Sequence, residues 1–133
     1  MAFKKMTGRQ EILSAVVPIL AADWQAGITL VPVADLPVGA ILVGGGILVH
    51  TAFNSTTNSL DLGDAVDADR YTQAGVVDLK TPGFTAFDGE FLYYPNGVSI
   101  TVDYVQTGAV PSAGLAYLVI EYVIVDRATE VQP

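Results

Sequence analysis

The feature that most constrains this chain is a nearly unbroken apolar run close to its end, Leu115–Asp126. Its residues are mainly β-branched, aliphatic and aromatic types, many of which favour strands. The run is well short of the roughly 20 apolar residues that a membrane-spanning helix needs. It therefore predicts one long strand, buried on both faces or nearly so.

Strand patterns also recur through the rest of the chain, at roughly ten-residue spacing. Apolar and polar residues alternate in Val98–Val105, which is typical of a half-buried antiparallel strand. Asp88-Gly89 and Asn96-Gly97 are favoured hairpin pairs, so the runs on either side of each are predicted to form hairpins. The predicted strands cover residues 11–20, 28–33, 40–43, 47–53, 60–62, 76–79, 84–87, 90–94, 98–105 and 115–126.

Three interruptions refine this prediction. Pro32 has no N–H to donate, so its strand is expected at a sheet edge. The three glycines of Gly44–Gly46 predict a bulge or bend. Asp64–Ala74 is the only predicted helix, of one to three turns.

Strands that do not alternate with helices exclude parallel α/β folds and predict an antiparallel all-β sandwich or barrel. A jelly roll is the first choice and an immunoglobulin-like sandwich the alternative. Residues 11–127 are predicted to form a single β-domain, preceded by a basic arm (1–10) and followed by a tail (128–133).

Charge is unevenly distributed along the chain. The net charge is −8, and Lys4, Lys5 and Arg9 give the first ten residues +3, so the other 123 residues carry −11. Nucleic acid is therefore not an expected partner, because phosphates require a basic face. The arm is a candidate for docking on an acidic neighbour, and a solvated terminus is the alternative.

Chemical signatures are scarce. His50 is the only histidine, there is no Cys, and no nucleophile motif is present, so neither catalysis nor a cofactor is expected. Asp64, Asp67 and Asp69 are weak candidates for a metal site, because their spacing misses the EF-hand pattern. The alternative is that one of these acids caps a short helix.

Three aromatic residues are candidate interface anchors: Trp24 in a predicted loop, and the adjacent Tyr93 and Tyr94. Neighbouring residues of a strand face opposite ways, so one of the two tyrosines is expected to point outward. Partial burial at the core edge is the alternative for all three. Together with Lys4, Lys5 and Arg9 they form the predicted partner-binding set.

Several turn and strand segments between Asp35 and Asp126, about two-thirds of the chain, carry a family resemblance. They are Asp35–Ala40, Gly44-Gly45, Thr51–Ser55, Leu62–Asp64, Asp67–Tyr71, Thr107-Gly108 and Val119–Tyr122. In these segments the chain resembles small virion structural proteins of tailed bacteriophages, of the kind that decorate or cement the capsid. The resemblance implies a β-sandwich or barrel, a homo-oligomer, a position on the outer capsid and no enzymatic activity. It assigns no functional residue.

The predicted function is therefore that of a capsid decoration protein, which bridges capsomers on the outer surface of a phage head. Its expected partners are the major capsid protein and itself, as a dimer or trimer, and neither nucleic acid nor a membrane. Synthesis in the cytoplasm of a bacterial host is expected. One alternative is a carbohydrate- or calcium-binding β-sandwich module of a phage fibre, and another is a component of the tail or head–tail connector.

Overall fold

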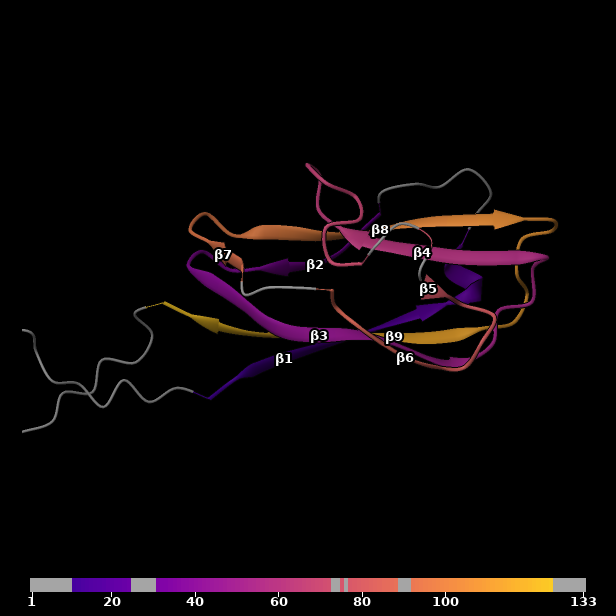
Figure 1. The fold of residues 1–133 in the computed structure, drawn as a ribbon, viewed down its shortest axis with the longest axis horizontal. Coiled ribbons are helices and arrows are strands. Elements are labelled where there is room, and N and C mark those ends of the chain that lie inside the picture. Colours follow the sequence, from indigo (N-terminus) through magenta and orange to yellow (C-terminus); the bar gives the residue numbers. More distant parts are fainter. Residues whose placement is uncertain (1–10, 25–30, 73–74, 76, 89–91, 126–133) are drawn as a thin grey trace, which may run out of the picture.

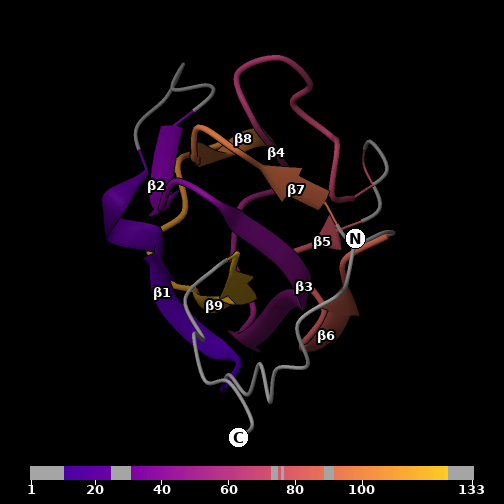
Figure 2. The ribbon, with the colours of Figure 1, turned by 90° about the vertical axis from the view of Figure 1, so that its left-hand side faces the viewer.

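Two antiparallel sheets packed face to face form the molecule (Figure 1; Figure 2 shows the two layers end-on). The computed structural model describes residues 11–24, 31–72, 75, 77–88 and 92–125. The first sheet contains β1 (Leu13–Leu20), β9 (Leu115–Ile124), β3 (Ala40–Thr51) and β6 (Gly83–Ala86) in that order, and β7 (Leu92–Tyr94) also pairs with β3. The second contains β2 (Val31–Leu36), β8 (Val98–Thr107), β4 (Thr57–Gly63) and β5 (Val77–Asp78). The predicted all-β sandwich is confirmed.

Strand order distinguishes the two predicted sandwich types. Most consecutive strands lie in different sheets, and β4 and β5 are the consecutive pair that is hydrogen-bonded in the described chain. This alternation between layers is the arrangement of a jelly roll with two Greek keys. An immunoglobulin-like sandwich would instead pair further consecutive strands within each sheet.

The predicted closing strand is β9, which lies between β1 and β3 in the first sheet. Its inward residues Ala116, Leu118 and Ile120 are completely buried. The outward residues Tyr117 and Val119 are partly exposed, so the strand is fully buried on its inward face and only partly buried on the other. Apolar character on both sides of a strand thus does not imply that both sides are covered.

The hairpin predictions were wrong in their pairing. β6 pairs with β3 at Gly46–Val49 and β7 pairs with β3 at Ala40–Leu42, so both follow the same edge of β3. Gly89 lies outside the described residues. The turn before Gly97 does form, with the Gly97 N–H donating to the Tyr94 carbonyl at 3.1 Å, but it leads from the first sheet into the second. A turn sequence determines where the chain reverses, whereas packing of the core determines which strands pair.

Two other local predictions are confirmed. The pairing of β3 with β9 shifts register between Leu42 and Gly44, so the predicted bulge forms where the glycine run begins. β2 lies at the end of its sheet and pairs with β8, which agrees with Pro32 as an edge residue.

The predicted helix after Asp64 does not form over residues 64–72, which make turns and bends. The Tyr71 N–H donates to the Leu62 carbonyl at 2.9 Å, and the Leu62 N–H donates to Thr72 Oγ1 at 3.0 Å. These bonds tie the segment to β4 and compete with a helical path. The described helix is instead a 3₁₀ turn at Ala21–Asp23, directly after β1.

Candidate protein-binding surfaces

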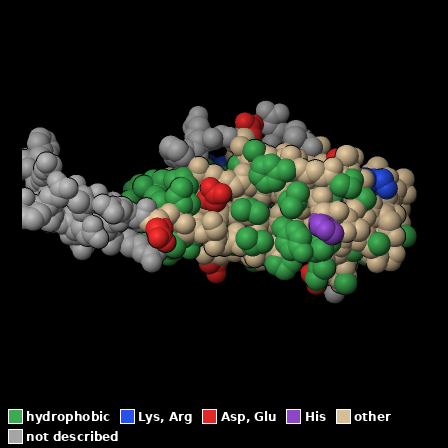
Figure 3. Space-filling model, turned by 90° about the horizontal axis from the view of Figure 1, so that it is seen from below, with side chains coloured by type: hydrophobic (Ala, Val, Ile, Leu, Met, Phe, Trp, Pro, Cys, Tyr) green, Lys and Arg blue, Asp and Glu red, His purple; other side chains and the backbone are tan. Residues whose placement is uncertain are grey.

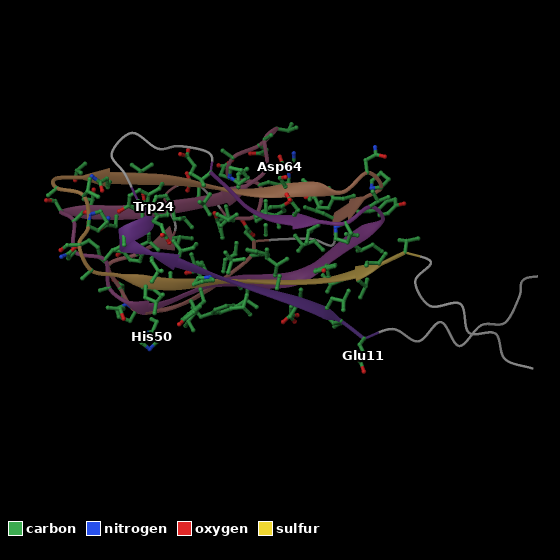
Figure 4. The ribbon with its side chains drawn as sticks, turned by 180° about the vertical axis from the view of Figure 1, so that it is seen from behind. Glu11, Trp24, His50 and Asp64 are labelled. Carbon is green, nitrogen blue, oxygen red and sulfur yellow. The ribbon has the colours of Figure 1, made fainter. Side chains whose placement is uncertain are left out.

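Trp24 is not an exposed anchor. Its side chain is only 7% exposed and lies between the two sheets (Figure 4). The indole stacks on Tyr104 of β8 with ring centroids 3.9 Å apart and an interplanar angle of 25°. The 3₁₀ turn after β1 directs the chain from the first sheet towards the second, so a residue predicted in a loop is carried into the core.

Tyr93 and Tyr94 face opposite ways, as predicted. Tyr93 is 55% exposed, whereas Tyr94 is partly buried and its hydroxyl hydrogen-bonds that of Tyr71. Burial, and then the bond to Tyr94, raises the pKa of Tyr71. Burial also raises the pKa of Tyr94, although its bond to Tyr71 acts the other way. Of the three predicted aromatic anchors, Tyr93 is therefore the one with a largely exposed side chain.

Asp64 organises the loop that follows β4. Its Oδ1 accepts the backbone N–H groups of Val66 and Asp67 at 3.0 and 2.9 Å, and its Oδ2 accepts Arg70 Nε at 2.6 Å. Burial alone would raise the pKa of Asp64, but the bonds from Arg70, Asp67 and Val66 outweigh it and hold this pKa below its usual value. Asp64 thus caps the backbone N–H groups that follow it, as the alternative to a metal site predicted. The segment that it caps is a turn and not the predicted helix.

The three candidate metal ligands are not brought together. Asp67 Oδ1 accepts the Asp69 N–H at 3.3 Å, and both Asp64 oxygens already have donors. Within the described ranges, no group of three or more His, Cys, Asp or Glu side chains is placed to hold a metal ion.

Hollows next to this loop gather few reactive groups. One of about 640 Å³ is lined by Arg70, Tyr71 and Asp88 together with apolar residues and glycines. A second, of about 570 Å³, is lined by Asp64, Arg70, Tyr93 and their neighbours. His50 lines neither hollow. It lies at the outer side of the first sheet (Figure 4), where its Nδ1 is 3.0 Å from Thr51 Oγ1.

The outer face of the first sheet is the surface that sequence reasoning missed. Register places four side chains in one line across the sheet, here called the large row: Pro18, Tyr117, Leu48 and Phe84. Phe84 is 58% exposed and Leu48 39%. Figure 3 views this face and shows hydrophobic side chains grouped around the histidine.

The next line across the same face, here called the small row, holds Val16, Val119, Gly46 and Ala86. On the other side of the large row lie Leu20 and Leu115. The four strands that the two rows cross, β1, β9, β3 and β6, carry no Lys or Arg, and Glu121 is their one acidic residue. A sequence signal for this face exists, because alternation along the predicted strand 47–53 puts Leu48 and His50 on the same side. The sequence does not show which residues of the neighbouring strands lie beside them.

The outer face of the second sheet has the opposite character. It carries Asp35 on β2, Asp103 on β8, Asp61 on β4 and Asp78 on β5. Asp61 and Asp103 are directly opposite each other in register. The molecule therefore has one acidic outer face and one apolar, nearly uncharged outer face.

The remaining predicted partner-binding residues, Lys4, Lys5 and Arg9, lie outside the described residues. No helix in the described segments is long and apolar enough to cross a membrane.

Comparison with known proteins identifies a fold. No protein-family model and no curated protein matches the chain significantly. A chain of the cyanophage Pam1 capsid asymmetric unit is similar, with 22% identity, a TM-score of 0.65, and coverage of 85% of this chain and 84% of that one. A chain of the acidic stable capsid structure of Helicobacter pylori bacteriophage KHP30 is also similar, with 14% identity, a TM-score of 0.63, and coverage of 92% and 98%. The resemblance to phage virion structural proteins is thus confirmed at the level of the fold, which this chain shares with chains of two phage capsid structures.

Proposed function

We propose that this protein is a structural component of a phage virion, and specifically a decoration protein that bridges capsomers on the outer capsid surface. The observation that carries the proposal is the similarity of nearly the whole fold to chains of two phage capsid structures. The described surface adds a wide apolar face with several exposed large hydrophobic side chains.

In this role the protein binds the major capsid protein after synthesis in the cytoplasm of a bacterial host. Each single contact can be weak, because many copies bound to one particle act together and raise the overall affinity. The basic arm, with Lys4, Lys5 and Arg9, supplies a charge-dependent contact with an acidic part of the shell.

The test is co-sedimentation of the full chain with phage heads that lack it. Wild type is expected to pellet with the heads and to raise the temperature at which they release DNA. The triple variant Lys4→Ala, Lys5→Ala, Arg9→Ala is expected to bind more weakly and with less dependence on salt. Absence of binding at micromolar concentration, with correctly folded protein, would rule out the decoration role.

A fibre module that binds glycans is the second candidate, and one observation favours it. Tyr93 is exposed beside the hollow of about 570 Å³ that Asp64 and Arg70 also line. A glycan bound only by the folded protein would raise the melting temperature. A melting temperature unchanged by a panel of bacterial surface glycans at millimolar concentration, in wild type and in Tyr93→Ala alike, would remove this candidate.

A further inference from the structure

We propose that the outer face of the first sheet is the contact between two copies of this chain, related by a two-fold axis. The biological role of this contact rests on the proposed function, whereas the contact itself can be tested without capsids. Three features of the face favour such a contact: its chemistry, its shape and its area.

The chemistry of the face suits a second copy of the same acidic protein. The chain carries −8 overall, yet the large row and the small row contain no charged side chain. The four aspartates on the strands of the second sheet lie on the opposite outer face. Two copies that meet through their first sheets therefore keep these carboxylates on the far sides of the pair, where their repulsion is weakest.

The shape of the face is self-complementary, as a two-fold contact requires. The large row stands beside the small row, about two residues away along each strand. A two-fold axis between the two rows lays the large row of each copy over the small row of the other. At β6 the Phe84 ring lies against Gly46, where an added Cβ would be 2.6 Å from Phe84 Cζ, so the open part of the small row is at Val16 and Val119.

The area of the face fits a weak dimer. With about 3.3 Å per residue and about 4.8 Å between strands, the 8 residues of β1 and the four strands span roughly 500 Å². Two such faces bury about 1,000 Å², which is near the lower limit for a specific interface and below the roughly 1,600 Å² of a typical stable one. The pair is therefore expected to form at high concentration, or where a particle holds copies side by side.

Pairing through the edge of the same sheet is a poorer route. β1 is an edge strand, but Pro18 within it has no N–H for an added strand. A bare edge would bind a second strand through its backbone, and proline is a common means of preventing this. The exposed side chains of the face are thus a better contact than the edge.

Sedimentation velocity of the full chain, from micromolar to millimolar concentration, tests the contact. The test variant is Leu48→Ser with Phe84→Ser, and the matched control is Val105→Ser, which is 52% exposed on β8 of the second sheet. Wild type and control are expected to shift towards dimer with rising concentration, and the test variant to associate at least about tenfold more weakly. Equal melting temperatures of the three proteins would show that all are folded.

Salt supplies a second readout. Self-association through an uncharged face of an acidic protein is expected to strengthen with added NaCl, because salt screens the repulsion between copies. Docking of a basic arm on an acidic face would weaken instead, and that result would overturn the proposal. So would a wild type that stays monomeric at millimolar concentration, or a test variant that dimerises like wild type.

The same variants separate this proposal from the proposed function. In one outcome, wild type stays monomeric, and the control binds phage heads while the test variant does not. The face would then be the contact with the capsid shell, so the dimer would be refuted and the decoration role supported. A wild type that dimerises through the face but ignores heads would uphold the contact and refute decoration.

Discussion

Trp24 is the only tryptophan in the chain, and its indole connects the two sheets through the stacked ring of Tyr104. Trp24→Ala removes this contact and is expected to lower the free energy of unfolding by about 3–5 kcal/mol. Trp24→Phe keeps an aromatic ring and is expected to cost less than about 1.5 kcal/mol. The indole N–H finds no hydrogen-bond partner among the described residues, so its removal leaves no acceptor unpaired there.

Urea unfolding followed by circular dichroism measures both Trp24 variants on one scale. Equal losses for Trp24→Phe and Trp24→Ala would contradict this interpretation, because they would show that the aromatic ring retained in Trp24→Phe adds no stability. A nearly neutral Trp24→Ala would contradict burial of the ring itself.

Because of Asp64, the free energy of unfolding is expected to fall when the pH becomes acidic. The pKa of Asp64 is lower in the folded protein than the value of about 3.9 expected in the unfolded chain, so the ionised carboxylate stabilises the fold above about pH 4. That contribution is lost as the pH falls through the folded pKa. Asp64→Asn is expected to cost about 1–2 kcal/mol at pH 7, a modest value because Arg70 is partly exposed to solvent.

The check is the urea midpoint of wild type and Asp64→Asn at a series of pH values between 3 and 7. The two midpoints are expected to converge below about pH 4. Asp103→Asn is the control, because it removes a carboxylate that faces Asp61 and should be neutral or slightly stabilising at pH 7. A constant difference between wild type and Asp64→Asn at every pH would contradict the role of the charge.

At the scale of elements, β3 depends on one glycine to bend beside β9. Gly45 has a φ of +131°, and a Cβ there would lie 2.2 Å from the Val119 carbonyl oxygen. Gly45→Ala must therefore push apart the two strands with the most extensive pairing in the first sheet. We expect a loss of more than about 3 kcal/mol in the free energy of unfolding, since backbone strain and a backbone clash act together.

Gly83→Ala is the matched control for Gly45→Ala. Gly83 also has a positive φ, of +150°, but a Cβ there meets no atom within 4 Å. Only the backbone strain remains, and we expect a loss of roughly 1–2 kcal/mol. Thermal melting of both variants separates the two effects, and equal losses would show that the clash at β9 is relieved without cost.

Local residue patterns predicted the elements better than their partners. Strand runs, the edge position of Pro32 and the bulge of the glycine run follow from neighbouring residues, and all three are observed. The pairing of both β6 and β7 with β3 depends on the whole core, so turn residues could not reveal it. The large row brings together Pro18 and Tyr117, which are far apart in the sequence, so local patterns could not predict this candidate interface. Alternation along one strand was enough to predict that either Tyr93 or Tyr94 points outward.

For the whole molecule, the first sheet is complete only when β1 and β9, the first and last strands described, have paired. β1 pairs with β9, with Leu13 opposite Tyr122. Trp24, which follows the 3₁₀ turn after β1, stacks on Tyr104 of β8 in the other sheet. Contacts between such distant residues cost loop-closure entropy before they gain stability, so refolding is expected on the millisecond-to-second scale of β-sandwiches.

Equilibrium unfolding should then be all-or-none. Trp24 fluorescence reports contact between the sheets, and circular dichroism reports the strands, so the two transitions are expected to coincide. Leu118→Ala, at a fully buried position of β9, is expected to cost about 2–5 kcal/mol and to shift both transitions together. A fluorescence transition that precedes the loss of strands would mean that the two sheets separate before either melts, and that the pairing of β1 with β9 does not couple them.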